Sequence, residues 1–249
     1  MKKIFITTFN KKLYDIYASK LINSYIKTDQ SIPLYCYVED DINQYQKHDK
    51  IFYIDLYSAQ PECLNFVNKN YEKYKKYAEV YYLLDAVRFS YKVFAQSDSR
   101  KYGDHIFYID SDTEFKDHIP DDWYNECLPD DVFLTLHERL GYYTETGFLA
   151  FNNNIKNKQG NKIADEFFKI YTRFYTKDLI YALPAFLDCN ALDATRYRFK
   201  FLHKYILEYS FYKEKNLIVK ANHNQTNVDE NELIKAYFVH KKGNLKHKD

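Results

Sequence analysis

The order of apolar segments in the first 57 residues constrains the fold more than any other feature of the chain. The segment "KIFITTF" (3–9) has the composition of a buried β-strand, and residues 13–26 carry apolar side chains at the spacing of one helical face. Two further strand-like segments follow, "IPLYCYVED" (32–40) and "KIFYIDLY" (50–57). Because strand, helix, strand, strand is typical of the opening of a parallel α/β sheet, we expect that fold class.

The rest of the chain continues this alternation. A helical pattern covers residues 62–97 in two pieces, and the second piece, 80–95, is strongly apolar. The expected later strands are 105–109, 131–138, 146–152, 216–222 and 236–240, with helices at about 161–176 and 184–195. Since no repeat or low-complexity linker interrupts the pattern, we expect one domain over residues 1–249, built on a mixed, mostly parallel sheet flanked by helices.

Composition limits the classes of function. The 249 residues carry a formal net charge of +1, whereas general nucleic-acid-binding domains are usually strongly basic. The four cysteines, Cys36, Cys63, Cys127 and Cys189, lack the short spacing of a zinc site, which favours reduced thiols in a cytoplasmic protein. No segment approaches ~18 continuous apolar residues, so the sequence predicts no transmembrane segment.

The segment "HIFYIDSDTEF" (105–115) carries the clearest chemical signal. An apolar strand runs directly into Asp110 and Asp112, two carboxylates one residue apart, and a divalent cation is the usual means of offsetting their repulsion. Mg²⁺ and Mn²⁺ prefer such oxygen ligands and keep positions open for substrate phosphates. A turn rich in Asp and Ser is the alternative, but it does not explain the apolar strand that leads into the pair.

A charged helical face precedes this strand. Asp85, Arg88 and Lys92 are spaced i, i+3 and i+7, which places all three on one side of the expected helix. The spacing is compatible with a salt bridge at a solvated edge and equally with a charged face directed at an anionic ligand.

Two classes of enzyme place paired acids at the end of such a strand. The string "YIDSDTE" fits the Asp-x-Asp-x-Thr motif of haloacid-dehalogenase-like phosphatases through Thr113, where the first Asp is a nucleophile and the second a general acid/base. In nucleotide-sugar glycosyltransferases of the GT-A type, the pair instead holds a divalent ion on a nucleotide diphosphate. The phosphatase motif usually opens the first strand of its domain, whereas about 100 residues precede it here. This context favours the glycosyltransferase.

The order "DAVRFSYKVFA…HIFYIDSD" resembles the Asp-x-x-Arg helix and Asp-x-Asp strand of retaining sugar transferases, both the DXD-motif and toxin type and glycosyltransferase family 8. Asp85 and Arg88 match the positions that contact the donor sugar and nucleotide in those families. The segment "YYTETGFLAFN" (142–152) resembles the Gly-containing strand of family 8, although Glu145 and Thr146 stand where that family often has Asn-Ala or Ser-Gly.

The chain ends in "VHKKGNLK", whose His240, Gly243 and Lys246 resemble the His-x-x-Gly-x-x-Lys motif at the end of family 8. The resemblance implies that His240 is a third metal ligand, that the Gly243 backbone approaches the diphosphate, and that Lys246 neutralises it. The Pro-Trp that often follows in the family is absent here.

Three further positions complete the expected site. The segment "FLDCNALD" (186–193) resembles the family segment beside the donor sugar and acceptor, with Asp188 at the position of its Asp, although a helix with polar residues facing solvent fits it too. Thr7 and Thr8 on the first strand match the position where such folds hold the base and ribose, while β-propensity alone also explains them.

The resemblance as a whole implies a GT-A fold and a metal-dependent glycosyltransferase that uses Mn²⁺ or Mg²⁺. The expected reaction transfers a hexose from a nucleoside diphosphate sugar, with a UDP-sugar as the expected donor, to a hydroxyl of a glycan, lipid or protein. Retention of anomeric configuration is expected, with Asp188 and Glu145 as candidate catalytic residues. The alternatives are the phosphatase on Asp110 and Asp112 and a module that binds a nucleotide-sugar without turnover.

Overall fold

The computed structural model of the chain describes residues 1–139, 143–157, 159–202, 218–219 and 236–241. The strands are β1 (Lys3–Phe9), β2 (Leu34–Val38), β3 (Ile51–Asp55), β4 (His105–Ile109), β5 (Thr113–Phe115), β6 (Leu134–Arg139), β7 (Glu145–Asn152), β8 (Ile218–Val219) and β9 (Phe238–His240). The α-helices are α1 (Lys11–Leu13), α2 (Ser19–Lys27), α3 (Leu56–Ala59), α4 (Pro61–Val80), α5 (Ala86–Ser99), α6 (Asp121–Cys127), α7 (Ile163–Thr176) and α8 (Asp188–Leu202). A π-helix (Tyr14–Ala18) joins α1 to α2, and 3-10 helices cover Ile42–Gln44, Tyr82–Leu84 and Leu179–Ala182.

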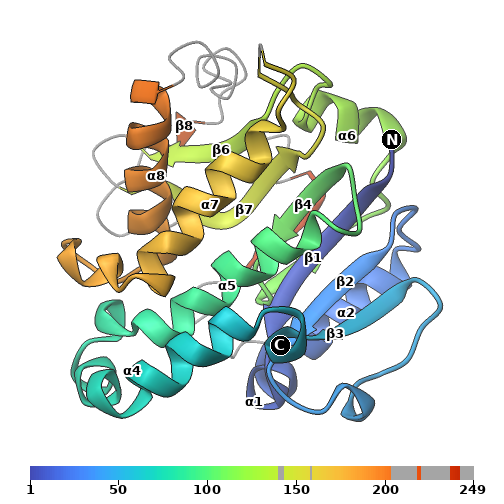
Figure 1. Cartoon of the computed structure of the whole chain (residues 1–249). Coiled ribbons are helices and arrows are strands. Elements are labelled where there is room, and N and C mark those ends of the chain that lie inside the picture. Colours follow the sequence, from blue (N-terminus) through green and yellow to red (C-terminus); the bar gives the residue numbers. More distant parts are fainter. Residues whose placement is uncertain (140–142, 158, 203–217, 220–235, 242–249) are drawn as a thin grey trace.

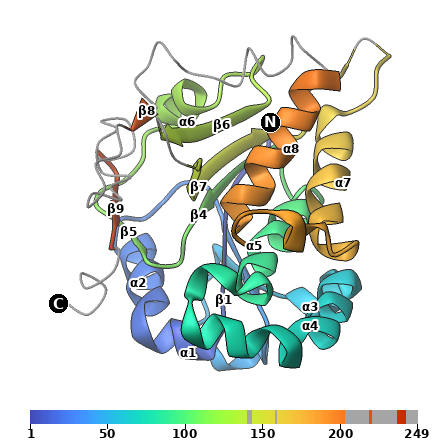
Figure 2. The ribbon, with the colours of Figure 1, turned by 90° about the vertical axis from the view of Figure 1, so that its left-hand side faces the viewer.

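A seven-stranded sheet in the order β3-β2-β1-β4-β7-β6-β8 lies between two layers of helices (Figures 1 and 2). Strands β1, β2, β3 and β4 pair in parallel, and so do β6 and β8, whereas β7 runs antiparallel to both β4 and β6. A separate two-stranded sheet pairs β5 with β9. The prediction of an α/β fold with a mixed, mostly parallel sheet flanked by helices is confirmed.

The order of the strands makes the end of β4 a candidate ligand site. The chain passes from β1 to β2 and β3 on one side, then crosses through α4 and α5 to β4 on the other side of β1. In open α/β sheets, ligands bind beyond the carboxyl ends of the strands where the strand order reverses in this way. Asp110 and Asp112 follow β4 directly at this switch point between β1 and β4.

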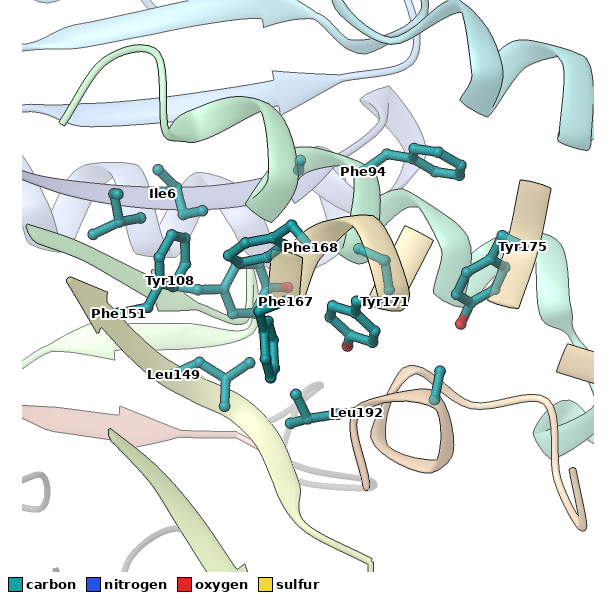
Figure 3. Packing of buried hydrophobic residues seen from close by; sticks show 14 of the residues in the cluster. Ile6, Phe94, Tyr108, Leu149, Phe151, Phe167, Phe168, Tyr171, Tyr175 and Leu192 are labelled. Carbon is teal, nitrogen blue, oxygen red and sulfur yellow. The ribbon is translucent and has the colours of Figure 1, made fainter. Parts of the chain in front are cut away.

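Strand alternation divides the core between the two faces of the sheet. On one face, Ile6, Tyr108 and Leu149 pack with aromatic residues of α5 and α7, and Figure 3 shows this cluster from close by. On the other face, Phe5 and Phe107 pack with residues of α2, α6, β5 and β9. The period of two along each strand therefore fixes which residues face α5 and which face the β5–β9 ribbon.

Some element boundaries differ from the sequence prediction because acidic side chains cap helices. The expected strand 50–57 ends at Asp55, whose carboxylate accepts hydrogen bonds from the backbone N–H of Tyr57 (3.0 Å) and of Ser58 (3.2 Å) at the start of α3. The second helical piece starts at Ala86 instead of residue 80, because Asp85 is its N-cap and accepts from the N–H of Arg88 at 2.9 Å.

Other differences concern the ends of elements and short elements; the helix expected at about 184–195, for example, is α8 and ends at Leu202. The strand expected at 131–138 begins at Leu134, and β8 is the part of the expected strand 216–222 that the structure describes. The sequence reasoning missed α6 and the three-residue strand β5, since neither is long enough to show a periodic pattern.

Two further observations concern the helices and the cysteines. Within the described ranges, every helix falls short of the combination of length and hydrophobicity needed to cross a bilayer. All four cysteines are buried free thiols.

Replacing Phe107 by Ala should lower the free energy of unfolding by about 3–5 kcal/mol, because its ring is fully buried at the centre of the sheet and contacts Phe5, Trp123 and Tyr124. Urea unfolding followed by circular dichroism measures this change. The matched control is Phe52→Ala on the edge strand β3, where the side chain is 44% exposed; it should cost less than about 1 kcal/mol. Equal costs at the two positions would contradict the packing described here.

Candidate metal centre

The two acids of the Asp-x-Asp segment are held by the turn that follows β4. The backbone N–H of Thr113 donates to the carbonyl of Asp110 at 3.0 Å, which closes the turn before β5 begins. The N–H of Asp110 in turn donates to the carbonyl of Gly147 on β7 at 2.9 Å. The side chain of Asp112 is buried and that of Asp110 is half-buried. Both acids therefore occupy fixed positions at the carboxyl edge of the sheet.

The third residue reaches this edge through the pairing of β9 with β5. The antiparallel register places His240 opposite Thr113, and the backbone N–H of Lys241 donates to the carbonyl of Asp112 at 2.9 Å. The Lys241 ammonium also pairs with Glu114 of β5 at 2.9 Å. Figure 2 shows β9 beside β5, next to α2. Residues separated by more than half of the chain thus meet at one point.

The distances among these three side chains suit a divalent cation. His240 Nε2 lies 2.8 Å from Asp112 Oδ1 and 3.7 Å from Asp110 Oδ2. One ligand atom from each residue lies within 4.8 Å of the others. Two carboxylates and one imidazole form a donor set that a divalent metal ion accepts, so Asp110, Asp112 and His240 could hold such an ion. The sequence motifs predicted this set of three residues.

A half-buried lysine neutralises part of the acidic charge. The Lys92 ammonium, on α5, lies 2.6 Å from Asp110 Oδ1 and 3.5 Å from Asp188 Oδ2. The Tyr108 hydroxyl donates to the same Asp110 oxygen at 2.8 Å. Burial by itself would lower the pKa of Lys92, but the carboxylates of Asp110 and Asp188 outweigh burial and hold that pKa above its ordinary value. Lys92 is therefore a fixed cation inside the acidic cluster.

The two candidate catalytic acids lie beside this lysine. Asp188 is the first residue of α8 and is 2% exposed, and burial raises the pKa of its carboxyl while Lys92 opposes the rise. Glu145 is the first residue of β7, accepts from the N–H of Gly147 at 3.0 Å, and interacts electrostatically with both Lys92 and Asp188. The structure thus gathers Asp110, Asp188 and Glu145 around one cation.

Gly147 lies against the imidazole of His240 in the candidate metal site. A Cβ at this position would lie 2.6 Å from His240 Cε1 and 3.0 Å from its Nδ1. Real Cβ atoms do not approach another atom as closely as the first of these distances, so His240 can occupy its place only because residue 147 has no side chain. The sequence analysis identified Gly147 as part of a motif, and the structure supplies the steric reason.

The remaining predicted residues have varied surroundings. The Thr7 and Thr8 side chains are buried near the end of β1, and neither hydroxyl has a hydrogen-bond partner among the described residues. Asp85 is the N-cap of α5 and accepts from the Arg88 N–H. It therefore precedes the helix and does not share a helical face with Arg88 and Lys92, as the spacing had suggested. The Arg88 side chain is exposed and interacts electrostatically with Glu39. Gly243 and Lys246 lie outside the described residues.

Tyr17 was not predicted from the sequence, although it lies beside the candidate metal site. It belongs to the π-helix that joins α1 to α2, an element that often occurs at functional sites. Burial, reinforced by the negative charge of Asp112, raises the pKa of Tyr17 to about 12, and its hydroxyl bonds to the Ser111 side chain. A π-helix has no distinctive sequence pattern, so only the structure identifies this residue.

Glu39, at the end of β2, is another acid at the same edge of the sheet. Burial raises the pKa of Glu39 to about 7, and the Asn10 side-chain amide donates to its carboxylate at 3.2 Å. The sequence did show that the expected strand 32–40 ends in acids. It did not show that these acids lie at the same edge of the sheet as the Asp-x-Asp pair.

Comparisons with known proteins leave the site to be judged on its geometry. No protein-family model matches the chain, and no curated protein sequence matches it.

Replacing Gly147 by Ala should lower the affinity of the protein for Mn²⁺ by about 10–100-fold, because the new methyl group displaces His240 from the two acids. The overpacking should also lower the free energy of unfolding by about 1–3 kcal/mol. Calorimetric titration with Mn²⁺ and urea unfolding measure the two effects.

A double-mutant cycle separates this account from general damage to β7. In a His240→Ala background the methyl group has room, so Gly147→Ala should cost much less stability and should not weaken Mn²⁺ binding further. Additive effects of the two substitutions would show that Gly147 does not act through His240.

Proposed function

We propose that the chain is a metal-dependent glycosyltransferase with a GT-A fold, which transfers a hexose from a nucleoside diphosphate sugar to a hydroxyl group. The observation that carries the proposal is the convergence of Asp110, Asp112 and His240 at the switch point of the sheet. Three separate segments that resemble sugar transferases in sequence supply these residues and their neighbours: the Asp-x-Asp strand, the strand that contains Gly147 and the C-terminal His segment. A UDP-sugar is the proposed donor.

The diphosphate of such a donor requires positive charge. A divalent cation held by Asp110, Asp112 and His240 would supply charge stabilisation to the leaving diphosphate. Arg88 lies on the α5 helix at the same edge of the sheet, with its side chain exposed, and would add a second positive charge on the donor. Lys246 is the corresponding candidate from the C-terminal segment. Charge stabilisation of this kind is often the largest contribution to catalysis.

The protein groups around the sugar would be acidic. In the transfer, the bond between the anomeric carbon and the diphosphate oxygen breaks and its electron pair leaves with the diphosphate. The acceptor oxygen bonds to that carbon, and the acceptor proton passes to the departing diphosphate. Glu145 and Asp188 lie close to the cluster and would stabilise positive charge on the sugar or orient the acceptor hydroxyl. The hydroxyls of Thr7 and Thr8 would contact the nucleoside. We expect the transfer to retain the anomeric configuration, because the sequence motifs resemble those of retaining sugar transferases.

The binding step predicts a metal-dependent rise in the melting temperature with uridine diphosphate. At a ligand concentration 100 times the dissociation constant, the stabilisation is about 2.7 kcal/mol, which corresponds to a rise of roughly 5–10 °C for a chain of this size. The rise should be largest with Mn²⁺ or Mg²⁺ present and should lose its metal-dependent part in Asp112→Asn. Asp49→Asn is the control, because Asp49 is an exposed acid whose side chain is 80% accessible. Equal shifts in Asp112→Asn and the wild type would contradict the proposal.

The chemical step predicts hydrolysis of one member of a panel of UDP-sugars when Mn²⁺ is present. In Asp110→Asn the rate should fall by about 10²–10³-fold, as it does when one charge-stabilising group is removed from an active site. Turnover of simple phosphate esters without any sugar donor would favour the phosphatase alternative. Tight binding of the nucleotide without turnover of any donor would favour a binding module.

A further inference from the structure

The two oxygens of the Asp110 carboxylate have different surroundings. Oδ1 accepts a hydrogen bond from Tyr108 at 2.8 Å and lies 2.6 Å from the Lys92 ammonium. Oδ2 is the oxygen that faces His240, at 3.7 Å from its Nε2. Strand alternation explains the arrangement, because residue 110 follows Tyr108 on the face of the sheet that α5 covers. Only one oxygen of this carboxylate is directed toward the metal cluster.

Lys92 is held in this position by more than one interaction. Its ammonium lies 3.5 Å from Asp188 Oδ2 and 5.7 Å from the centre of the Tyr108 ring, and its side chain is only 18% exposed. A buried ammonium requires such compensation, since leaving it unpaired is costly. Both Lys92 and the Asp110 oxygen that it contacts are therefore constrained by packing on the α5 face.

We propose that Lys92 is a positioning residue that restricts Asp110 to one metal-binding oxygen, so that the site selects Mg²⁺ or Mn²⁺ over Ca²⁺. The inference rests on the part of the proposed function that places a divalent cation on Asp110, Asp112 and His240. It does not depend on the identity of the substrate. Neither the sequence motifs nor the resemblance to sugar transferases assigns Lys92 a role at the metal.

The coordination chemistry of the ions supports this selection. Ca²⁺ takes six to eight oxygen ligands and often binds carboxylates through both oxygens, whereas Mg²⁺ takes six ligands in an octahedron and binds one or two carboxylates through single oxygens. An ammonium on Oδ1 blocks the two-oxygen mode at Asp110. Ca²⁺ takes oxygen ligands, so the imidazole of His240 also disfavours Ca²⁺. The positive charge of Lys92 also repels a metal ion that binds without substrate. A larger share of the metal affinity then comes from ligand atoms that the substrate supplies.

The test is the ratio of Ca²⁺ to Mn²⁺ affinity, measured by calorimetric titration of the full chain with each metal alone. The wild type should bind Mn²⁺ more tightly than Ca²⁺. In Lys92→Met, which keeps the length of the side chain and removes the charge, the ratio should shift toward Ca²⁺ by about tenfold or more. A general loss of structure would weaken both ions together and would leave their ratio unchanged, so the ratio reports the positioning role.

A second variant covers the case in which Lys92→Met does not fold because two carboxylates lose their partner. Lys92→Met combined with Asp188→Asn removes one acid with the ammonium and leaves Oδ1 of Asp110 with only the neutral Tyr108 hydroxyl, which can give way to a metal ion. Lys101→Met is the matched control, because Lys101 also pairs with a buried acid, Asp98, and is not part of the metal cluster. The double variant should show the shifted ratio, and the control should keep the wild-type ratio.

The outcomes separate this inference from the proposed function. Equal affinity of the wild type for Ca²⁺ and Mn²⁺, or an unchanged ratio in both Lys92 variants, would overturn the role of Lys92 and leave the metal site standing. Failure of the wild type to bind any divalent cation, with or without uridine diphosphate, would overturn both.

Discussion

The pairing of β9 with β5 is the interaction on which the candidate site depends. It sets His240 opposite Thr113, and a shift by one residue would turn the imidazole to the other face of the ribbon. Aromatic packing holds the ribbon in place, with the rings of Phe115 and Phe238 5.1 Å apart and Phe238 also against Trp123. A three-residue strand is too short to be stable alone. The hydrophobic core around Phe238 and the candidate metal site at His240 therefore both depend on the pairing of β9 with β5.

Electrostatic balance is the second requirement of the site. Asp110, Asp112, Asp188 and Glu145 come together at one edge of the sheet, an arrangement that like charges oppose. Lys92 offsets part of this repulsion from within the protein, and a divalent cation would offset the rest. Since these four acids outnumber Lys92 among the described residues, the site is suited to bind a cation together with an anionic ligand, as the proposed donor would require.

The sequence predicted the parts of this site that are close together along the chain or carried by a short motif. The apolar strand that runs into Asp110 and Asp112 indicated a metal site at the end of that strand, and a three-residue motif indicated His240. Other features depend on packing between distant segments. The contact of Lys92 with Asp110 requires the crossing of α5 over β4, and the need for glycine at position 147 arises from an imidazole on a strand more than 90 residues later. The sequence did not identify Asp85 as a helix cap, because its spacing from Arg88 and Lys92 fits one face of a helix equally well.

The central claim is that His240 and the two acids bind one cation together, and pulsed electron paramagnetic resonance of the Mn²⁺-loaded protein tests it most directly. The account predicts a coupling between the manganese and one imidazole nitrogen in the wild type. That coupling should disappear in His240→Ala at a Mn²⁺ concentration that still fills the site. The absence of nitrogen coupling in the wild type, or a coupling that persists without His240, would contradict the account.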